Sequence, residues 1–264
     1  MSNILPAVFF AASLSAQPVA QPSGGGTPEF RAVSFTVEND YGFSDRYYTN
    51  GLKLSYTQSG RDFWTSRLQF ALLDLFAPDG AQAYESVSVG QMMCVSSDIN
   101  WPNPPEWDRP YAGWLYAGFG AHAATRDTLD SFTVNLGVVG PISLAEDAQK
   151  FYHSIIGADW PMGWHDQIKN EPGIVLSYRH SQRVVRGKIE SLDFDAVASA
   201  ALDLGNVMTQ GEARAFLRFG KNLPHNFEPN RIDYSSGNDA AWIPPDGLPD
   251  WHLYGFVGGA ARFV

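Results

Sequence analysis

Apolar and polar residues alternate along most of the chain after Phe30, which is the pattern of β-strands with two different faces. The alternation is clearest at 33–38, 51–58 and 131–138. Weaker strand candidates lie at 114–122, 174–179, 191–204, 213–219 and 253–264. Gly, Pro, Asn and Asp separate these segments, so the pattern predicts an antiparallel meander.

The residues opposite the apolar positions are mostly Ser, Thr, Asn, Lys and Arg. A polar interior with an apolar exterior is typical of a transmembrane β-barrel, although a soluble β-sandwich shows the same alternation. No segment after the N-terminus approaches the 18 or so consecutive apolar residues of a membrane-spanning helix, which argues against a helical membrane protein.

One segment has helical rather than alternating spacing. Ser143 and Glu146 form a capping-box pattern, and Gly157 stands where a glycine would end the helix. His153 and Gln149 lie on the polar face, so the plain interpretation is a solvated surface histidine. The other face is apolar and carries Leu144, Ala148, Phe151, Tyr152, Ile155 and Ile156.

The N-terminus resembles a secretory signal peptide, with a short apolar core at 4–14 and small residues before possible cleavage points at Ala16 and Ala20. Residues 1–20 are therefore expected to be a signal peptide. Residues 21–29 are rich in Pro and Gly and predict a flexible lead-in. The remaining residues, 30–264, predict one domain, because no boundary or internal repeat interrupts them.

Composition narrows the classes of function. The net charge is −10 and no basic cluster is present, which argues against nucleic acid as a partner. The single cysteine, Cys94, excludes a disulfide framework and a cysteine-based zinc site. The sequence has no serine-hydrolase elbow, P-loop, H-E-x-x-H or EF-hand motif. Aromatic residues at 14% and charged residues at 17% suit a β-protein or an outer-membrane barrel.

An oxygen-rich group lies between the first two predicted strands after Phe30. Asn39 and Asp40 end one strand, and Thr49 and Asn50 begin the next. A hairpin would bring these side chains together, and their carboxylate, amide and hydroxyl oxygens suit a hard cation such as Ca²⁺. An Asx-rich turn would explain the same residues, so both interpretations stay open.

Four segments together resemble the lipid A 3′-O-deacylase family of Gram-negative outer membranes, over residues from about Phe30 to Val264. They are ENDYGFSDRYYTNGLKLSY, DRPYAGWLYAGFG, GVVGP and FYHSIIGADWPMGWHDQIKNEPG. The resemblance implies an all-β fold, an antiparallel transmembrane β-barrel with one short helix near the active site. The family barrel has twelve strands. About nine are expected here, which predicts a C-terminally truncated barrel.

The resemblance also implies a reaction, the Ca²⁺-dependent hydrolysis of the 3′ acyloxyacyl ester of lipid A. The family's metal-binding pair corresponds to Asn39 and Asp40, its strand-end threonine to Thr49, and its essential helix histidine to His153. A neutral imidazole can take a proton from water, and a bound Ca²⁺ can stabilise the oxyanion that forms.

Substrate binding departs from the family pattern. Some members carry a lysine for a substrate phosphate, whereas residues 91–107 hold no Lys or Arg. Arg46 and Arg109 are the candidate substitutes. The segment from Asp108 to Gly113 is expected to be mainly a structural turn, and His165 a residue that frames the helix end.

The expected partners are lipid A or lipopolysaccharide and the lipid of the outer membrane, for a monomeric protein exported to the cell outer membrane. Two alternatives stay open. One is a non-catalytic or degenerate barrel with a structural or binding role, in which His153 and Asp40 would be dispensable. The other is a soluble periplasmic β-protein.

Overall fold

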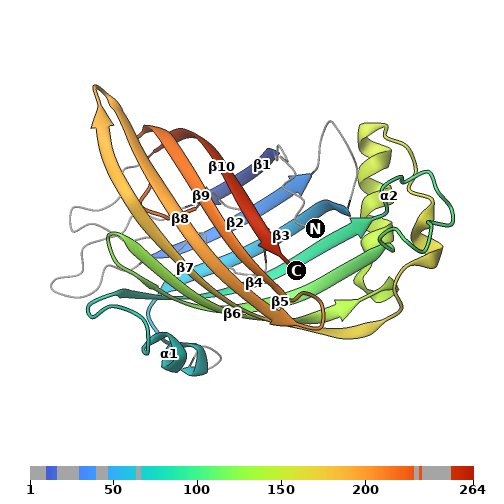
Figure 1. Cartoon of the computed structure of the whole chain (residues 1–264), viewed down its shortest axis with the longest axis horizontal. Helices are drawn as coiled ribbons and strands as arrows, with labels where there is room; N and C mark the ends of the chain where they lie inside the picture. The colour runs from blue at the N-terminus through green and yellow to red at the C-terminus, as the bar shows by residue number, and fades with distance from the viewer. Residues whose placement is uncertain (1–9, 17–29, 40–46, 64–66, 229–231, 234–250) are drawn as a thin grey trace.

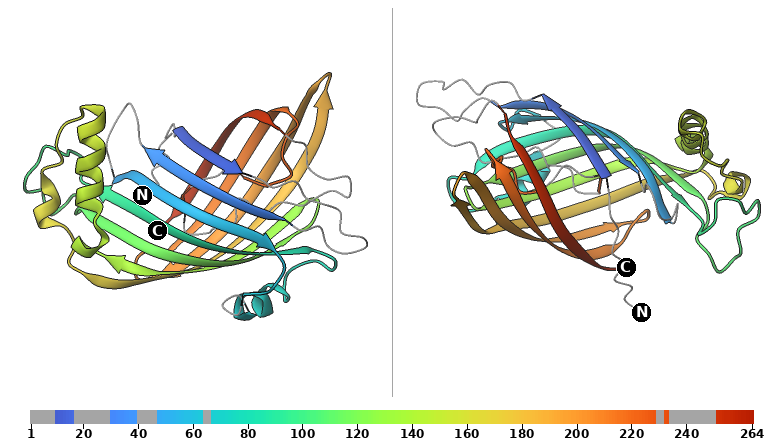
Figure 2. Two further views of the ribbon diagram at one scale, coloured as in Figure 1. Left: turned by 180° about the vertical axis from the view of Figure 1, so that it is seen from behind. Right: turned by 90° about the horizontal axis from the view of Figure 1, so that it is seen from above.

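The fold is a single curled antiparallel sheet in which the strands follow one another in chain order (Figure 1). In the computed structural model, the described residues are 10–16, 30–39, 47–63, 67–228, 232–233 and 251–264. The ten strands are β1 (Phe10–Ala16), β2 (Arg31–Asn39), β3 (Tyr47–Ser59), β4 (Gln82–Val95), β5 (Ala112–Ala124), β6 (Thr128–Val139), β7 (Glu171–Ile189), β8 (Leu192–Gly205), β9 (Gln210–Lys221) and β10 (Leu253–Phe263). Figure 2 shows that the sheet bends into a trough with β1 and β10 as its outermost strands.

Nine of these strands lie between residues 30 and 264, as the family resemblance implies. All eight strand segments predicted from alternation are confirmed. Strand β1 comes in addition and lies within the segment expected to be a signal peptide, where it pairs with β2. Cleavage of that segment stays a prediction.

The predicted polar interior and apolar exterior are confirmed. On β2, Ser34, Thr36 and Glu38 are buried on the concave side, whereas Val33 and Phe35 are about half exposed on the convex side. The same alternation continues along β3 and β6 to β9. The concave side is called the interior below, and the convex side the outer wall. Among the described residues, no helix is long and apolar enough to cross a membrane.

The segment that follows β9 turns back into the interior, which the alternation does not predict. Phe227 packs in a buried cluster with Phe30 and Tyr84, and Ile232 packs in a second cluster with Trp114. The backbone N–H of Ile232 donates to the Glu38 carboxylate at 2.8 Å. The interior is therefore filled in part by the chain's own returning segment.

Buried ion pairs hold this segment to the strands. Arg179 on β7 and Arg214 on β9 both pair with Glu228 and Asp233, at 2.9–3.4 Å. Their charges are hidden from water, and each has an opposite charge within bonding distance, which is the condition for burying ions at tolerable cost.

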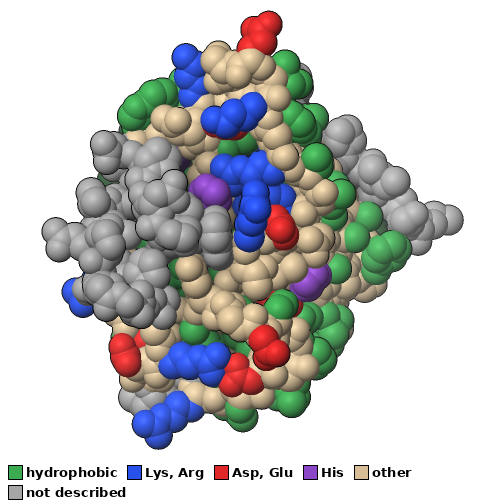
Figure 3. Space-filling view, turned by 90° about the vertical axis from the view of Figure 1, so that its left-hand side faces the viewer, with side chains coloured by type: hydrophobic (Ala, Val, Ile, Leu, Met, Phe, Trp, Pro, Cys, Tyr) green, Lys and Arg blue, Asp and Glu red, His purple; other side chains and the backbone are tan. Residues whose placement is uncertain are grey.

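A further buried ion pair joins β8 and β9. Arg218 donates two hydrogen bonds to Asp195, at 2.6 and 2.8 Å, and a third to the side chain of Asn226. Figure 3 looks onto the end of the strands opposite α2. It shows Lys and Arg side chains gathered beside a histidine near the centre of the view.

Strand β4 has no counterpart among the predicted strands. Its outward side carries the polar residues Glu85 and Gln91, and its inward side carries Met92, which reverses the usual contrast. Both polar side chains are satisfied by other segments. Glu85 accepts bonds from the backbone N–H groups of Asp62 and Phe63, and Gln91 donates to the carbonyl of Ser143. The alternation is broken because other segments cover the outer wall at both places.

Two α-helices lie against the outer wall, whereas the sequence predicts only one helix. Helix α2 (Ala145–Ile156) follows the short 3₁₀ helix η2 (Pro141–Ser143) and precedes η3 (Gly163–Asp166). Helix α1 (Arg67–Leu73) lies at the opposite end of the strands (Figure 1). Beside it, Arg61 forms two hydrogen bonds with Asp74, at 2.8 Å each, and these hold the pKa of that carboxyl below its usual range.

Candidate active site

Helix α2 begins and ends with residues in the left-handed conformation. The C-terminal prediction is confirmed, because Gly157 has φ 70° and its N–H bonds the carbonyl of His153. The capping box is wrong. The cap residue is Leu144, with φ 59°, and no side chain caps the helix. Ser143 instead belongs to η2, which turns the chain from β6 onto the outer wall.

The polar face of α2 is buried against the protein and its apolar face is exposed, which is the reverse of an amphipathic helix on a water-soluble protein. Gln149 and His153 are only 1% and 3% exposed, whereas Phe151 and Ile155 are 69% and 66% exposed. The interpretation of His153 as a solvated surface histidine is therefore wrong. An apolar outward face is what a helix presents to lipid, and the buried polar face leaves its functional groups against protein.

The tautomer of His153 follows from its hydrogen bond to a backbone carbonyl. Ring atom Nδ1 contacts the backbone carbonyl oxygen of Asp159. A carbonyl can only accept, so Nδ1 carries the proton, and in the neutral ring Nε2 is then unprotonated. The contact also fixes the ring plane. This arrangement prepares Nε2 to accept a proton, which is the task of a general base.

Gln149 is a candidate that the sequence reasoning left without a role. It lies one helical turn before His153, and its Oε1 accepts a 2.7 Å hydrogen bond from the indole of Trp164. Its Nε2 is buried and has no hydrogen-bond partner among the described residues. An unused donor beside a histidine can serve a ligand oxygen. The signal in the sequence was the four-residue spacing on one helix face.

Trp164 and Tyr111 form the floor under the helix. Both are almost fully buried, and their rings meet edge to face at 5.0 Å. They pack in one cluster with Met93 and Val95 of β4 and Ala145 of α2. Tyr111 and Trp164 belong to two of the segments that resemble the deacylase family. Both pack under the face of α2 that carries His153.

Close contact between η2, α2 and the wall depends on Gly113 of β5. A Cβ atom built on Gly113 would lie 2.2 Å from the Cβ of Ala145 and 2.2 Å from the Oγ of Ser143. Such distances are far below van der Waals contact. Only glycine lets the start of α2 approach the strand this closely.

We expect Gly113→Ala to displace the start of α2 and lower the activity proposed below by about tenfold, since a shift near 1 Å can cost more than that. The strain should cost about 1–3 kcal/mol. The rate of acyl release and the urea unfolding midpoint, measured on the same refolded sample, check both. The matched control is Gly211→Ala on β9, where the added Cβ meets no described atom within 4 Å. Equal activity of the two variants would contradict this role of Gly113.

The strand ends that carry the predicted metal site are partly described. Asn39 is the last residue of β2, and its backbone pairs with Asn50 of β3, so the predicted hairpin pairing is confirmed. Thr49 lies at a register shift between β3 and β4, because Tyr48 pairs with Cys94 and Asn50 with Met93. Bulges of this kind often occur beside active sites.

The remaining predicted residues differ in what can be said of them. Asp40 and Arg46 lie outside the described residues. Among the described side chains, no group of three or more His, Cys, Asp and Glu forms a metal site. The predicted Ca²⁺ site at Asn39 and Asp40 therefore stays a prediction, based on the hard-oxygen chemistry of those residues.

The structure brings the two halves of the predicted site to the same end of the sheet. Residues 47–50 of β3 pair with 93–95 of β4, and the side chains of Met93 and Val95 pack against the start of α2. Strand β4 therefore pairs with the strand that carries Thr49 and is itself part of the wall that α2 covers. Figure 1 shows α2 standing at this end of the strands.

Arg109 and His165 lie on the exposed side of the same region. Asp108 accepts two hydrogen bonds from Ser97, at 2.7 Å each, which agrees with the structural turn expected for this segment. Arg109 follows it with an exposed side chain. His165 is exposed and bonds Asn103 at 3.1 Å, so it lies outside the buried face of α2.

Comparison with known proteins gives one family and one solved structure. A family model described as outer membrane protein LpxR matches residues 5–264. The fold is similar to that of LpxR from Salmonella typhimurium, with a TM-score of 0.60 and 21% sequence identity. The match covers 83% of this chain and 67% of the Salmonella chain. At that identity the match shows the fold alone. No match was found among curated proteins.

Proposed function

The chain belongs to the LpxR family of outer membrane proteins, and from this premise we propose that it hydrolyses the 3′ acyloxyacyl ester of lipid A. The observation that carries the proposal is His153, which is buried on the inward face of α2 while the apolar face of the helix points outward. A base beside a lipid-facing surface suits an ester that is itself part of a membrane lipid.

The reaction we propose uses water as the nucleophile. Nε2 of His153 takes a proton from the water as it attacks the ester carbonyl, and the same proton then passes to the leaving alkoxide. The contact between Nδ1 and Asp159 stabilises the imidazolium formed in between. The amide of Gln149 lies on the same face and can donate to a substrate oxygen.

The oxyanion needs a positive partner, and the proposal assigns Ca²⁺ to Asn39 and Asp40. When bound, the cation supplies Lewis-acid stabilisation of negative charge. Thr49 would supply a further oxygen or orient the water. A carboxylate, an amide and a hydroxyl are the ligand types that Ca²⁺ prefers.

The proposed recognition of lipid A involves both its phosphate groups and its acyl chains. Arg46 and Arg109 are proposed to bind the phosphate groups, because guanidinium groups match phosphate geometry. The exposed apolar side chains of α2 are proposed to contact acyl chains. Because α2 is proposed to contact lipid A, the end of the sheet that carries α2 faces the outer leaflet, where lipid A resides.

The proposal is tested with purified, refolded protein and lipid A in mixed micelles. We expect loss of one acyloxyacyl group by mass spectrometry, loss of that activity in EGTA, and recovery when Ca²⁺ is restored in excess. Asp40→Ala should not recover at the same Ca²⁺ concentration, because one ligand of the cation is gone. Unchanged lipid A with folded wild-type protein in Ca²⁺ would refute the function. Full activity in EGTA would refute the role of Ca²⁺ but not the hydrolysis of lipid A.

A further inference from the structure

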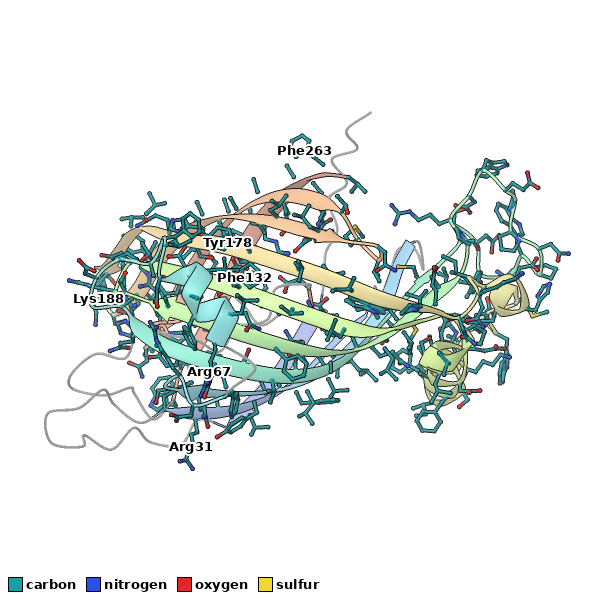
Figure 4. The ribbon with its side chains drawn as sticks, turned by 90° about the horizontal axis from the view of Figure 1, so that it is seen from below. Arg31, Arg67, Phe132, Tyr178, Lys188 and Phe263 are labelled. Carbon is teal, nitrogen blue, oxygen red and sulfur yellow. The ribbon has the colours of Figure 1, made fainter. Side chains whose placement is uncertain are left out.

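Helix α1 and the turn that follows it pack on the outer wall at the end opposite α2. Phe70 and Leu73 are almost fully buried there and form a cluster with Ala121 of β5, against which Phe132 and Tyr178 also pack. Figure 4 shows the helix lying across the outside of the strands, with Phe132 and Tyr178 beside it. The segment is thus part of the wall's exterior.

Polar contacts hold the segment in this place. The backbone N–H groups of Asp62 and Phe63 donate to Glu85 of β4, which is fully buried. Gln69 donates to the carbonyl of Phe119 at 3.3 Å. The guanidinium of Arg61 lies 4.4 Å from the centre of the Phe70 ring. The helix is therefore fastened to the sheet on both sides, and its orientation follows from these contacts.

The exposed surface of the segment carries three large apolar side chains beside the charged Arg67 and the ion-paired Arg61 and Asp74. Leu68 and Leu75 are each 72% exposed and Phe76 is 66% exposed. These side chains are more exposed than Leu54 in the middle of the wall, at 53%. Three large apolar side chains this exposed on one short segment mark a surface that is covered in the working protein.

The surface lies on the same outward side of the sheet as the part of the wall that α2 covers. Ala121 under α1 and Gly113 under the start of α2 both lie on the outward side of β5, with Phe119, Ala117 and Leu115 between them. The stretch from Gly113 to Ala121 is about 27 Å long at about 3.4 Å per residue. With a strand tilt near 40° it spans about 21 Å of barrel height, close to the apolar band of about 25 Å in outer-membrane barrels.

We propose that α1 and the turn that follows it form an interfacial anchor, whose Leu68, Leu75 and Phe76 insert among the acyl chains of the leaflet opposite α2. The two helices then mark the two borders of the apolar band on one side of the barrel. The ring of Phe76 meets that of Tyr178 at 5.8 Å, and the Tyr178 hydroxyl donates to Asp130, as an aromatic girdle residue would at an interface. Assigning this leaflet to the periplasmic side rests on the proposed function.

Site-directed spin labelling tests the anchor without measuring activity. Nitroxides are attached at Leu68→Cys and Leu75→Cys, each in a Cys94→Ala background, in phosphatidylethanolamine–phosphatidylglycerol vesicles. The positive control is Leu54→Cys on the wall, and the negative control is Asp79→Cys in the exposed turn after the helix. Heat-modifiable mobility on gels shows that each labelled barrel is folded.

We expect the labels at 68 and 75 to match the label at 54, with at least a severalfold higher accessibility to oxygen than to a water-soluble nickel chelate. The label at 79 should show the reverse ratio. A nickel-accessible label at either 68 or 75 would overturn the anchor and point to an aqueous or protein-covered surface. Lipid-exposed labels on a protein that leaves lipid A unchanged would remove only the proposed function and the leaflet assignment.

Discussion

Replacing His153 by glutamine is expected to lower kcat/KM for ester hydrolysis by about 10²–10⁴-fold, the usual contribution of a general base. Glutamine has nearly the same size and its amide can still donate to the Asp159 carbonyl, so the packing of α2 is kept. What is lost is an unprotonated ring nitrogen that accepts the proton of water. The measurement is the rate of acyl release from lipid A, normalised to the folded fraction.

The matched control for this variant is His165→Gln. That histidine follows His153 closely in the chain but is exposed, and its ring contacts the side chains of Asn103 and Asp166. Its replacement should leave the rate within about twofold of the wild type, because surface substitutions seldom disturb a site. Equal rates for His153→Gln and the wild type, with folded barrels, would contradict the assignment of the base.

The second large effect is expected in the interior, where Arg218→Met should lower the free energy of unfolding by about 3–5 kcal/mol. Arg218 and Asp195 are both fully buried. After the change, the 3.3 Å bond from Arg183 is the one hydrogen bond that Asp195 keeps among the described residues, so a buried carboxylate loses most of its compensation. The bond from Arg218 to Asn226 is lost as well, which loosens the returning segment.

Urea titration of the refolded protein in detergent micelles measures this loss. The control is Lys188→Met, which removes an ion pair with Asp193 whose lysine is 74% exposed. An exposed pair of this kind contributes about 0–1 kcal/mol. Similar unfolding midpoints for the two variants would mean that the interior ion pairs do not hold the fold together.

The strands were predictable because each one obeys a local rule. Val33 and Phe35 face outward while Ser34 and Thr36 face inward, so a period of two is enough to find β2. The rule fails at β4, where Glu85 and Gln91 face outward because other segments cover them. Helix α1 was missed for a related reason, since its seven residues are too few for a clear period.

The returning segment could not be predicted from local patterns at all. Phe227, Glu228 and Asp233 make contacts with β9, which directly precedes the segment, and with β2 and β7, which are far away in the chain. No spacing rule connects the segment with these distant strands. Such contacts become visible only when the curl of the sheet brings the strands around a common interior.

The candidate site was accessible to sequence reasoning in part. The helix and its glycine end were correct, but its orientation was reversed, because the usual rule assumes water outside the protein. In a membrane the apolar face turns outward and His153 turns inward. Asn39 and Thr49 were singled out by the oxygen-rich strand ends, and their roles came from the resemblance. Asn39 ends β2 and pairs with Asn50 of β3, and the part of Asn39 and Thr49 in binding Ca²⁺ stays a prediction.

Under the proposed function, the outward apolar face of α2 also determines how the lipid substrate reaches the site. A lipid that meets Phe151 and Ile155 has already dissolved in the same membrane, so encounter is lateral diffusion in two dimensions rather than diffusion through water. Occupancy of the site then follows the mole fraction of the lipid in the bilayer. Under the proposed function, unreactive lipid slows turnover simply by diluting the surface, even at constant bulk concentration of lipid A.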